Sequence, residues 1–102
     1  MLVDPELDIA FSVVCIWEVV IKAAKSRSEF RIAPIMLRTR LVADGFRELP
    51  IVADHVLAVA SLEARHGDPF DRLMVAQAKA EGRKFLTSDR ILAGYGDWVE
   101  VV

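Results

Sequence analysis

The chain has 102 residues, of which 54% are hydrophobic and 27% are charged, and its formal net charge at neutral pH is −2. This composition excludes a disordered or low-complexity protein and lacks the overall basic character typical of nucleic-acid-binding proteins. The length allows one small domain, which we place at residues 1–102 because no linker or repeat divides the chain.

The cysteine content and the N-terminus both bear on the cellular compartment. Cys15 has no second cysteine with which to form an internal disulfide or a zinc knuckle. The first eight residues carry acids where a secretory signal would carry basic residues. The longest apolar run, 13–21, is interrupted by Glu18 and is too short to span a membrane. We therefore expect a soluble, cytoplasmic protein in a reducing compartment.

Short apolar segments alternate with segments of helical periodicity along the chain. In chain order, we expect a strand at 9–14, a helix at 16–25, a helix at 35–43, a strand at 46–52, a helix from 54 to 63 or 64, a helix at 70–81, a strand at 84–87, a helical turn at 90–95 and a strand at 98–102. Strands separated by helices favour an α/β fold with a parallel sheet over a helix bundle.

Local residue types predict where several helices begin and end. Pro34 suits the first turn of its helix, and Asp54 is expected to cap the helix that follows it. The clearest boundary is Asp68, which is followed by proline at the first helical position and by Asp71 three residues later. Gly82 ends that helix.

Three acids occur where the predicted secondary structure changes. Glu18 is expected in the first turn of a helix, Asp71 in the first turn of another, and Asp89 directly after a strand. The carboxyl ends of parallel strands and the following helix N-termini share one edge of a sheet, where ligands usually bind. Three carboxylates at that edge would suit Mg²⁺ or Mn²⁺, which lowers the pKa of a bound water and stabilises charge on a phosphodiester.

Each acid also has a purely structural interpretation. Glu18 and Lys22 are spaced as an ordinary i,i+4 pair on a helix surface. Asp71 can complete a capping box begun by Asp68, and Asp89 can be a simple N-cap. Spacing alone leaves both interpretations open.

The remaining polar residues indicate less. His55 and His66 are too few and too far apart for a zinc site, and we expect a structural role for His66, with a phosphate contact as the alternative. Cys15 is predicted to be a buried, inert thiol. Residues 22–47 carry seven basic side chains against two acidic ones, which is typical of a solvated helix face, or of a surface that holds a phosphodiester backbone.

Four motifs together resemble one family. They are Ser12-Val-Val-Cys-Ile-Trp-Glu-Val-Val-Ile-Lys, Gly45-Phe-Arg-Glu-Leu-Pro-Ile, His66-Gly-Asp-Pro-Phe-Asp-Arg-Leu-Met-Val-Ala-Gln-Ala and Phe85-Leu-Thr-Ser-Asp. In this order and spacing the sequence resembles PIN-domain ribonucleases of the VapC toxin type, over nearly the whole chain. The Asp-Pro-Phe-Asp-Arg block followed by Ala-Gln-Ala is the most specific element.

The resemblance implies a three-layer α/β domain with a parallel sheet of about four short strands flanked by helices. It implies a metal-dependent endoribonuclease, the toxin of a type II toxin–antitoxin system, which binds Mg²⁺ or Mn²⁺ and is neutralised by a cognate antitoxin protein. By motif, Glu18, Asp71 and Asp89 correspond to the catalytic, metal-binding acids. Asp68 is similar to an additional metal-binding acid, and Thr87 matches the hydroxyl residue beside the last acid.

The sequence departs from the family pattern at its start. Family members begin with a central strand whose aspartate is a principal metal ligand, but only thirteen residues separate Asp4 from Glu18 here. We therefore expect an N-terminally truncated domain that lacks the first strand and helix. The alternative function is a catalytically impaired remnant that binds an antitoxin or associates with itself, and a homodimer is expected in either case because open strand edges need cover.

Overall fold

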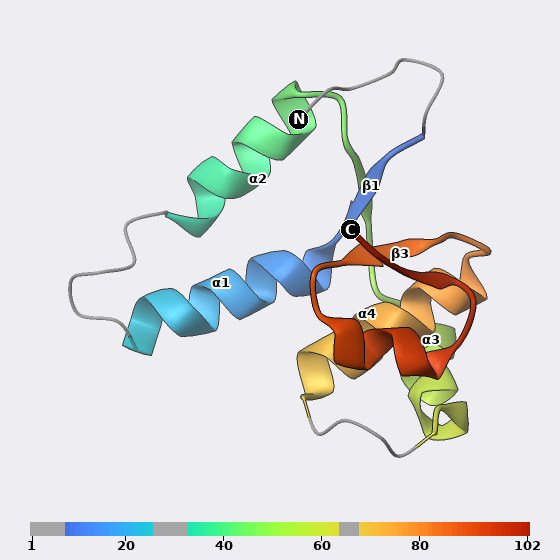
Figure 1. Ribbon diagram of the computed structural model, residues 1–102. Helices are drawn as coiled ribbons and strands as arrows, with labels where there is room; N and C mark the ends of the chain where they lie inside the picture. The colour runs from blue at the N-terminus through green and yellow to red at the C-terminus, as the bar shows by residue number, and fades with distance from the viewer. Residues whose placement is uncertain (1–7, 26–32, 64–67) are drawn as a thin grey trace. The chain divides into compact units, whose positions relative to one another are not determined.

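The computed structural model describes residues 8–25, 33–63 and 68–102, and it has the α/β architecture expected from the sequence (Figure 1). The chain divides into two compact units, Met1–Pro50 and Ile51–Val102. Across the described ranges, no helix has both the length and the apolar character needed to cross a bilayer.

The first unit contains two strands and two helices. They are β1 (Ala10–Ser12), α1 (Val13–Lys25), α2 (Pro34–Ala43) and β2 (Arg47–Leu49). β1 and β2 pair in parallel, and α1 packs against α2. Phe11 and Val14 are the buried apolar residues of this unit in the described ranges, at 9% and 2% exposure. Pro34 begins α2, as the sequence predicts.

α1 begins earlier than the sequence suggests. The Ser12 hydroxyl oxygen accepts a hydrogen bond from the Val14 amide at 3.1 Å, which is the geometry of a helix N-cap. The sequence predicts that the β-branched pair at 13–14 extends the strand, but with Ser12 as the cap these two residues form the start of the helix. Glu18 therefore lies in the second turn of α1, and the expectation of a first-turn position is wrong.

The second unit is built around one buried helix. Its elements are α3 (Ala53–Ala58), η1 (Val59–Ser61), α4 (Pro69–Ala80), β3 (Phe85–Thr87), η2 (Arg90–Tyr95) and β4 (Val99–Val101). The predicted boundaries of α4, η2 and the two strands hold to within two residues. The core comprises Leu62, Val75, Ala76, Leu92, Tyr95 and Val99.

The start of α3 corrects the predicted capping residue. Val52, rather than Asp54, occupies the N-cap position, and its amide donates to Nδ1 of His55 at 3.1 Å. His55 is only 3% exposed. Because an amide can only donate, Nδ1 is the acceptor and the proton of the neutral ring is on Nε2, which lies 2.8 Å from Oε1 of Glu81. The ring thus joins the start of α3 to the end of α4.

The strands in the described ranges pair two by two. β1 pairs with β2 in the first unit and β3 pairs with β4 in the second, each pair in parallel. Each strand has three residues. The number and parallel direction of these strands agree with the prediction from the sequence. The sequence predicts a single sheet, however, whereas the described strands form two separate parallel pairs.

Gly96 permits a close approach of the Trp98 ring. The indole Nε1 of Trp98 donates to the Val75 carbonyl at 3.0 Å, and Lys79 lies 4.7 Å from the centroid of the ring. A Cβ atom on Gly96 would overlap the indole. The φ of Gly96 is +158°, a backbone conformation that residues with a Cβ atom rarely adopt.

Gly96→Ala is expected to lower the free energy of unfolding by about 1–3 kcal/mol, because the indole must move and its bond to Val75 is lost. Chemical denaturation measures the loss. Gly82→Ala is the control, since Gly82 also has a positive φ, of +67°, but open space where its Cβ would stand. Equal losses in the two variants would show that the contact with Trp98 is unimportant.

Candidate acidic site

Glu18 is held in the pair that helical spacing predicts. Its Oε2 lies 3.7 Å from Nζ of Lys22, and the two side chains are 24% and 61% exposed, respectively. An exposed pair of this kind contributes a few tenths of a kcal/mol. Glu18 therefore forms the surface ion pair that its structural interpretation predicts. Because this pair is weak, the Glu18 carboxylate can leave Lys22 for another cation.

Asp68 and Asp71 stand at the start of α4. Asp68 is the N-cap, and its Oδ1 accepts from the amides of Phe70 at 2.9 Å and of Asp71 at 3.4 Å. Asp71 lies in the first turn and is half-buried. The positive end of the helix dipole favours negative charge at both positions. The predicted cap is confirmed, and it uses one of the two Asp68 oxygens.

Asp89 follows β3 and caps η2. Its Oδ1 accepts from the Ile91 amide at 3.0 Å, and its own amide donates to the Thr87 hydroxyl oxygen at 3.1 Å. Thr87 therefore fixes the turn that carries Asp89, and the predicted N-cap is confirmed. The Asp89 side chain remains half-buried.

Topology brings two of these acids to one end of the second unit. α4 leads into β3 through residues 81–84, so that the helix and the strand run in opposite directions. The start of α4 and the end of β3 consequently lie at the same end of this unit, as Figure 1 shows. Asp71 belongs to the first of these positions and Asp89 follows the second, whereas Glu18 belongs to the first unit.

The carboxylate oxygens of these residues are suitable ligands for a divalent cation, because Mg²⁺ and Mn²⁺ prefer hard oxygen donors. The caps leave a second oxygen on Asp68 and on Asp89 that no described hydrogen bond uses. Within residues 8–25, 33–63 and 68–102, no group of three or more His, Cys, Asp or Glu side chains is close enough together to hold a metal ion.

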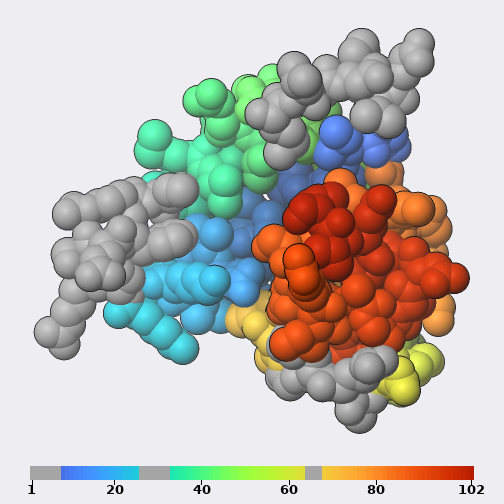
Figure 2. Space-filling model, in the orientation of Figure 1, coloured from blue at the N-terminus to red at the C-terminus, as the bar shows by residue number. Residues whose placement is uncertain are grey.

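Four of the five described basic side chains in the 22–47 run pair with acids of their own unit. Arg38 donates to Glu48 through Nε at 2.6 Å and Nη2 at 3.1 Å. Three further pairs are Lys22–Glu18, Arg40–Asp44 and Arg47–Asp8. Figure 2 shows α2, in green, on the surface of the first unit. The solvated helix face is thus the interpretation that the structure supports; Arg27 and Arg31 lie outside the described residues.

The contact between Arg38 and Glu48 shifts the pKa values of both side chains. Its hydrogen bonds, helped by the charge of the guanidinium, hold the pKa of Glu48 below its usual value and raise the pKa of Arg38. Cys15 is half-buried, and burial, with a smaller effect of the Glu18 charge, raises the pKa of its thiol. A thiol with a raised pKa is poorly reactive, which agrees with the predicted inert cysteine.

Sequence reasoning missed two residues that organise the second unit. His55 joins α3 to α4, and Arg72 contacts three segments at once. His55 stands three residues after Val52, the position from which a side chain can reach back to the N-cap amide, and this spacing could have indicated the histidine contact. No local pattern could have indicated the partners of Arg72, which lie between 9 and 23 residues away. His66 lies outside the described residues.

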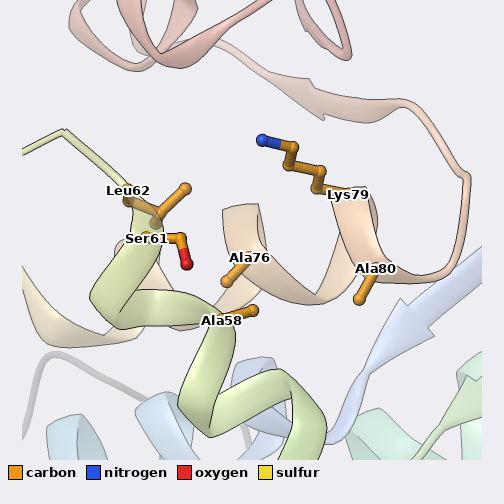
Figure 3. A pocket seen from close by; sticks show the side chains of 6 residues that line it. All are labelled: Ala58, Ser61, Leu62, Ala76, Lys79 and Ala80. Atoms are coloured by element: carbon orange, nitrogen blue, oxygen red, sulfur yellow. The ribbon is translucent and has the colours of Figure 1, made fainter.

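The second unit also has a pocket that none of these acids lines. It lies between η1 and α4, has a volume of about 340 Å³ and contains no carboxylate (Figure 3). The residues that line it are Ala58, Ser61, Leu62, Ala76, Lys79 and Ala80. Apart from the Ser61 hydroxyl, its lining side chains offer no oxygen ligand, and the positive charge of Lys79 disfavours a cation.

Comparison with known families decides the relationship. The PIN domain family model matches residues 2–97, which includes all the motifs at Glu18, Asp68, Asp71 and Asp89. The chain belongs to the PIN domain family. PIN domains are generally nucleases, often the toxins of toxin–antitoxin pairs, and they typically bind divalent metals such as Mg²⁺. No curated protein and no solved structure matches the chain.

Arg38→Met is expected to return the pKa of Glu48 to its ordinary value, because it removes the hydrogen bonds that favour the carboxylate. The side-chain carboxyl of Glu48 can be titrated by NMR. Since its pKa is lowered in the folded protein, the pair stabilises the fold above the ordinary glutamate pKa and loses this effect as the pH falls through the lowered value. Arg40→Met should leave Glu48 unchanged, and an unaltered Glu48 titration in Arg38→Met would contradict the assignment.

Proposed function

We propose that this PIN domain is a metal-dependent endoribonuclease of the VapC type, the toxin of a toxin–antitoxin pair. The observation that carries the proposal is the family match, which spans residues 2–97 and therefore both units. It is supported by the placement of Asp71 and Asp89 at one end of the second unit. On this proposal the two units function together as one PIN-like domain.

The proposed ligands of Mg²⁺ or Mn²⁺ are Glu18, Asp71 and Asp89, with Asp68 as an additional acid. Such a cation lowers the pKa of water and offsets the charge that develops on a phosphodiester during hydrolysis. The residues themselves supply negative charge on short, well-held side chains. The dipole of α4 favours ionised Asp71, while Thr87 and the Ile91 amide fix the turn and the carboxylate of Asp89.

Substrate RNA would be held mainly through its phosphates. Most described basic side chains of the 22–47 run are engaged in ion pairs, but these pairs are exposed and can exchange an internal carboxylate for a phosphate. Lys25, at the end of α1, is exposed and makes no ion pair with a described residue. Contacts of this kind position a backbone and carry no base specificity.

Asp71→Asn is expected to abolish Mn²⁺-stimulated cleavage of RNA, because an amide keeps the size of the side chain but removes its charge. Cleavage of a labelled RNA with and without Mn²⁺ measures the effect. Asp54→Asn is the matched control, since Asp54 is also a first-turn acid, on the exposed side of α3. Wild-type cleavage rates in Asp71→Asn would remove this residue from the mechanism.

A second candidate function, a self-associating or antitoxin-binding module, is favoured by exposed apolar side chains. Among the described residues, large apolar side chains that are more than half exposed include Trp17, Ile35, Met36, Leu57 and Ile91. Both strand pairs also have backbone edges that no described strand covers. Surfaces of this kind are typical of protein–protein contacts.

We expect the purified chain to be a homodimer in size-exclusion chromatography with light scattering, because a partner would cover this apolar surface. The same fractions are assayed for RNA cleavage. An active dimer supports the nuclease, an inert dimer supports the interaction module, and a monomer at all concentrations contradicts the proposed self-association.

A further inference from the structure

We propose that Arg72 is a positioning residue that holds η2, and with it Asp89, in place against the start of α4. The inference deepens the proposed function and rests on it, because the position of Asp89 matters only if that acid acts together with Asp71. It concerns contacts within the second unit alone.

One guanidinium joins three segments. Nη1 of Arg72 donates to the Glu63 carbonyl at 2.9 Å and to the Tyr95 hydroxyl at 3.0 Å. Nη2 donates to the Val59 carbonyl at 3.4 Å, and the guanidinium carbon lies 5.8 Å from the centroid of the Tyr95 ring. The donors are fixed in one plane, so that the three acceptors are held at set positions relative to α4.

These contacts connect the two segments that carry the acids. Arg72 directly follows Asp71 in the first turns of α4, while Tyr95 is the last residue of η2, the short helix that Asp89 caps. η2 is also anchored by Leu92, which is 1% exposed and belongs to the same core cluster as Val75 of α4. η2 thus shares the apolar core with α4, and Arg72 supplies the polar contact between them.

Ligands of a divalent cation tolerate displacements of only a few tenths of an ångström, so that supporting contacts of this kind affect metal affinity. Lysine at position 72 would keep the positive charge but would offer a single nitrogen on a flexible stem. It could not reach the acceptors on η1, Glu63 and Tyr95 together. Substitution of Arg72 by lysine therefore distinguishes the effect of the guanidinium hydrogen bonds from the effect of the positive charge.

The test uses Arg72→Lys and Tyr95→Phe in the full chain. Tyr95→Phe removes only the hydroxyl acceptor and keeps the buried ring, so this variant keeps the proposal testable even if Arg72→Lys fails to fold. Mn²⁺ alone is titrated by calorimetry, and amide hydrogen exchange is followed at Ile91 and Leu92 without metal. Arg40→Lys is the matched control, because exposed Asp44, at the end of α2, is the one described residue with which Arg40 forms an ion pair.

We expect Mn²⁺ affinity to fall about tenfold in Arg72→Lys and by a smaller factor in Tyr95→Phe. Amide exchange in η2 should become faster in both variants, and Arg40→Lys should match the unaltered chain. Unchanged Mn²⁺ affinity in both folded variants would overturn the positioning role, even with faster exchange, and leave the proposed function standing. If the unaltered chain binds no Mn²⁺, the proposed function fails and the positioning role fails with it.

Discussion

The burial of α4 is the constraint on which the second unit depends. Val75 and Ala76 are 0% and 1% exposed, and they pack with side chains from η1, η2 and β4. Removing apolar area from water stabilises a fold by about 25 cal/mol per Å² and has no direction of its own. The orientation of the neighbouring segments around α4 is set by directional polar contacts, such as the hydrogen bond from Trp98 to the Val75 carbonyl. With α4 fixed in this way, its first turn and the end of β3 fall at the same end of the unit.

The acids of this unit serve the backbone and remain available for chemistry. Asp68 and Asp89 each satisfy helix amides through one oxygen, which leaves the negative charge of the carboxylate in place. Asparagine caps a helix about as well as aspartate does, so the capping role does not itself demand a charge. A cap and a metal ligand are therefore compatible roles for one side chain, and the confirmed caps do not exclude the chemistry typical of PIN domains.

The two units are stabilised differently. The second has a buried cluster, whereas the described residues of the first bury only Phe11 and Val14 among their apolar side chains and carry their ion pairs on the surface. Exposed ion pairs contribute little stability and weaken further with salt. Large apolar side chains of the first unit such as Trp17 and Ile35 are exposed in the part of the chain that the structure describes, and this is the physical basis for proposing a partner surface.

The sequence by itself determined the features that depend on neighbouring residues: the α/β class, the start of α4 at Asp68 and Pro69, its end before Gly82, and the short helix after Asp89. Caps and glycine stops act within a few residues, so their patterns can be read directly. Only the tertiary structure decided the contact of His55 with Glu81 and the role of Arg72. Their partners lie far away in the sequence, and distant groups are brought together by burial, which no local pattern records.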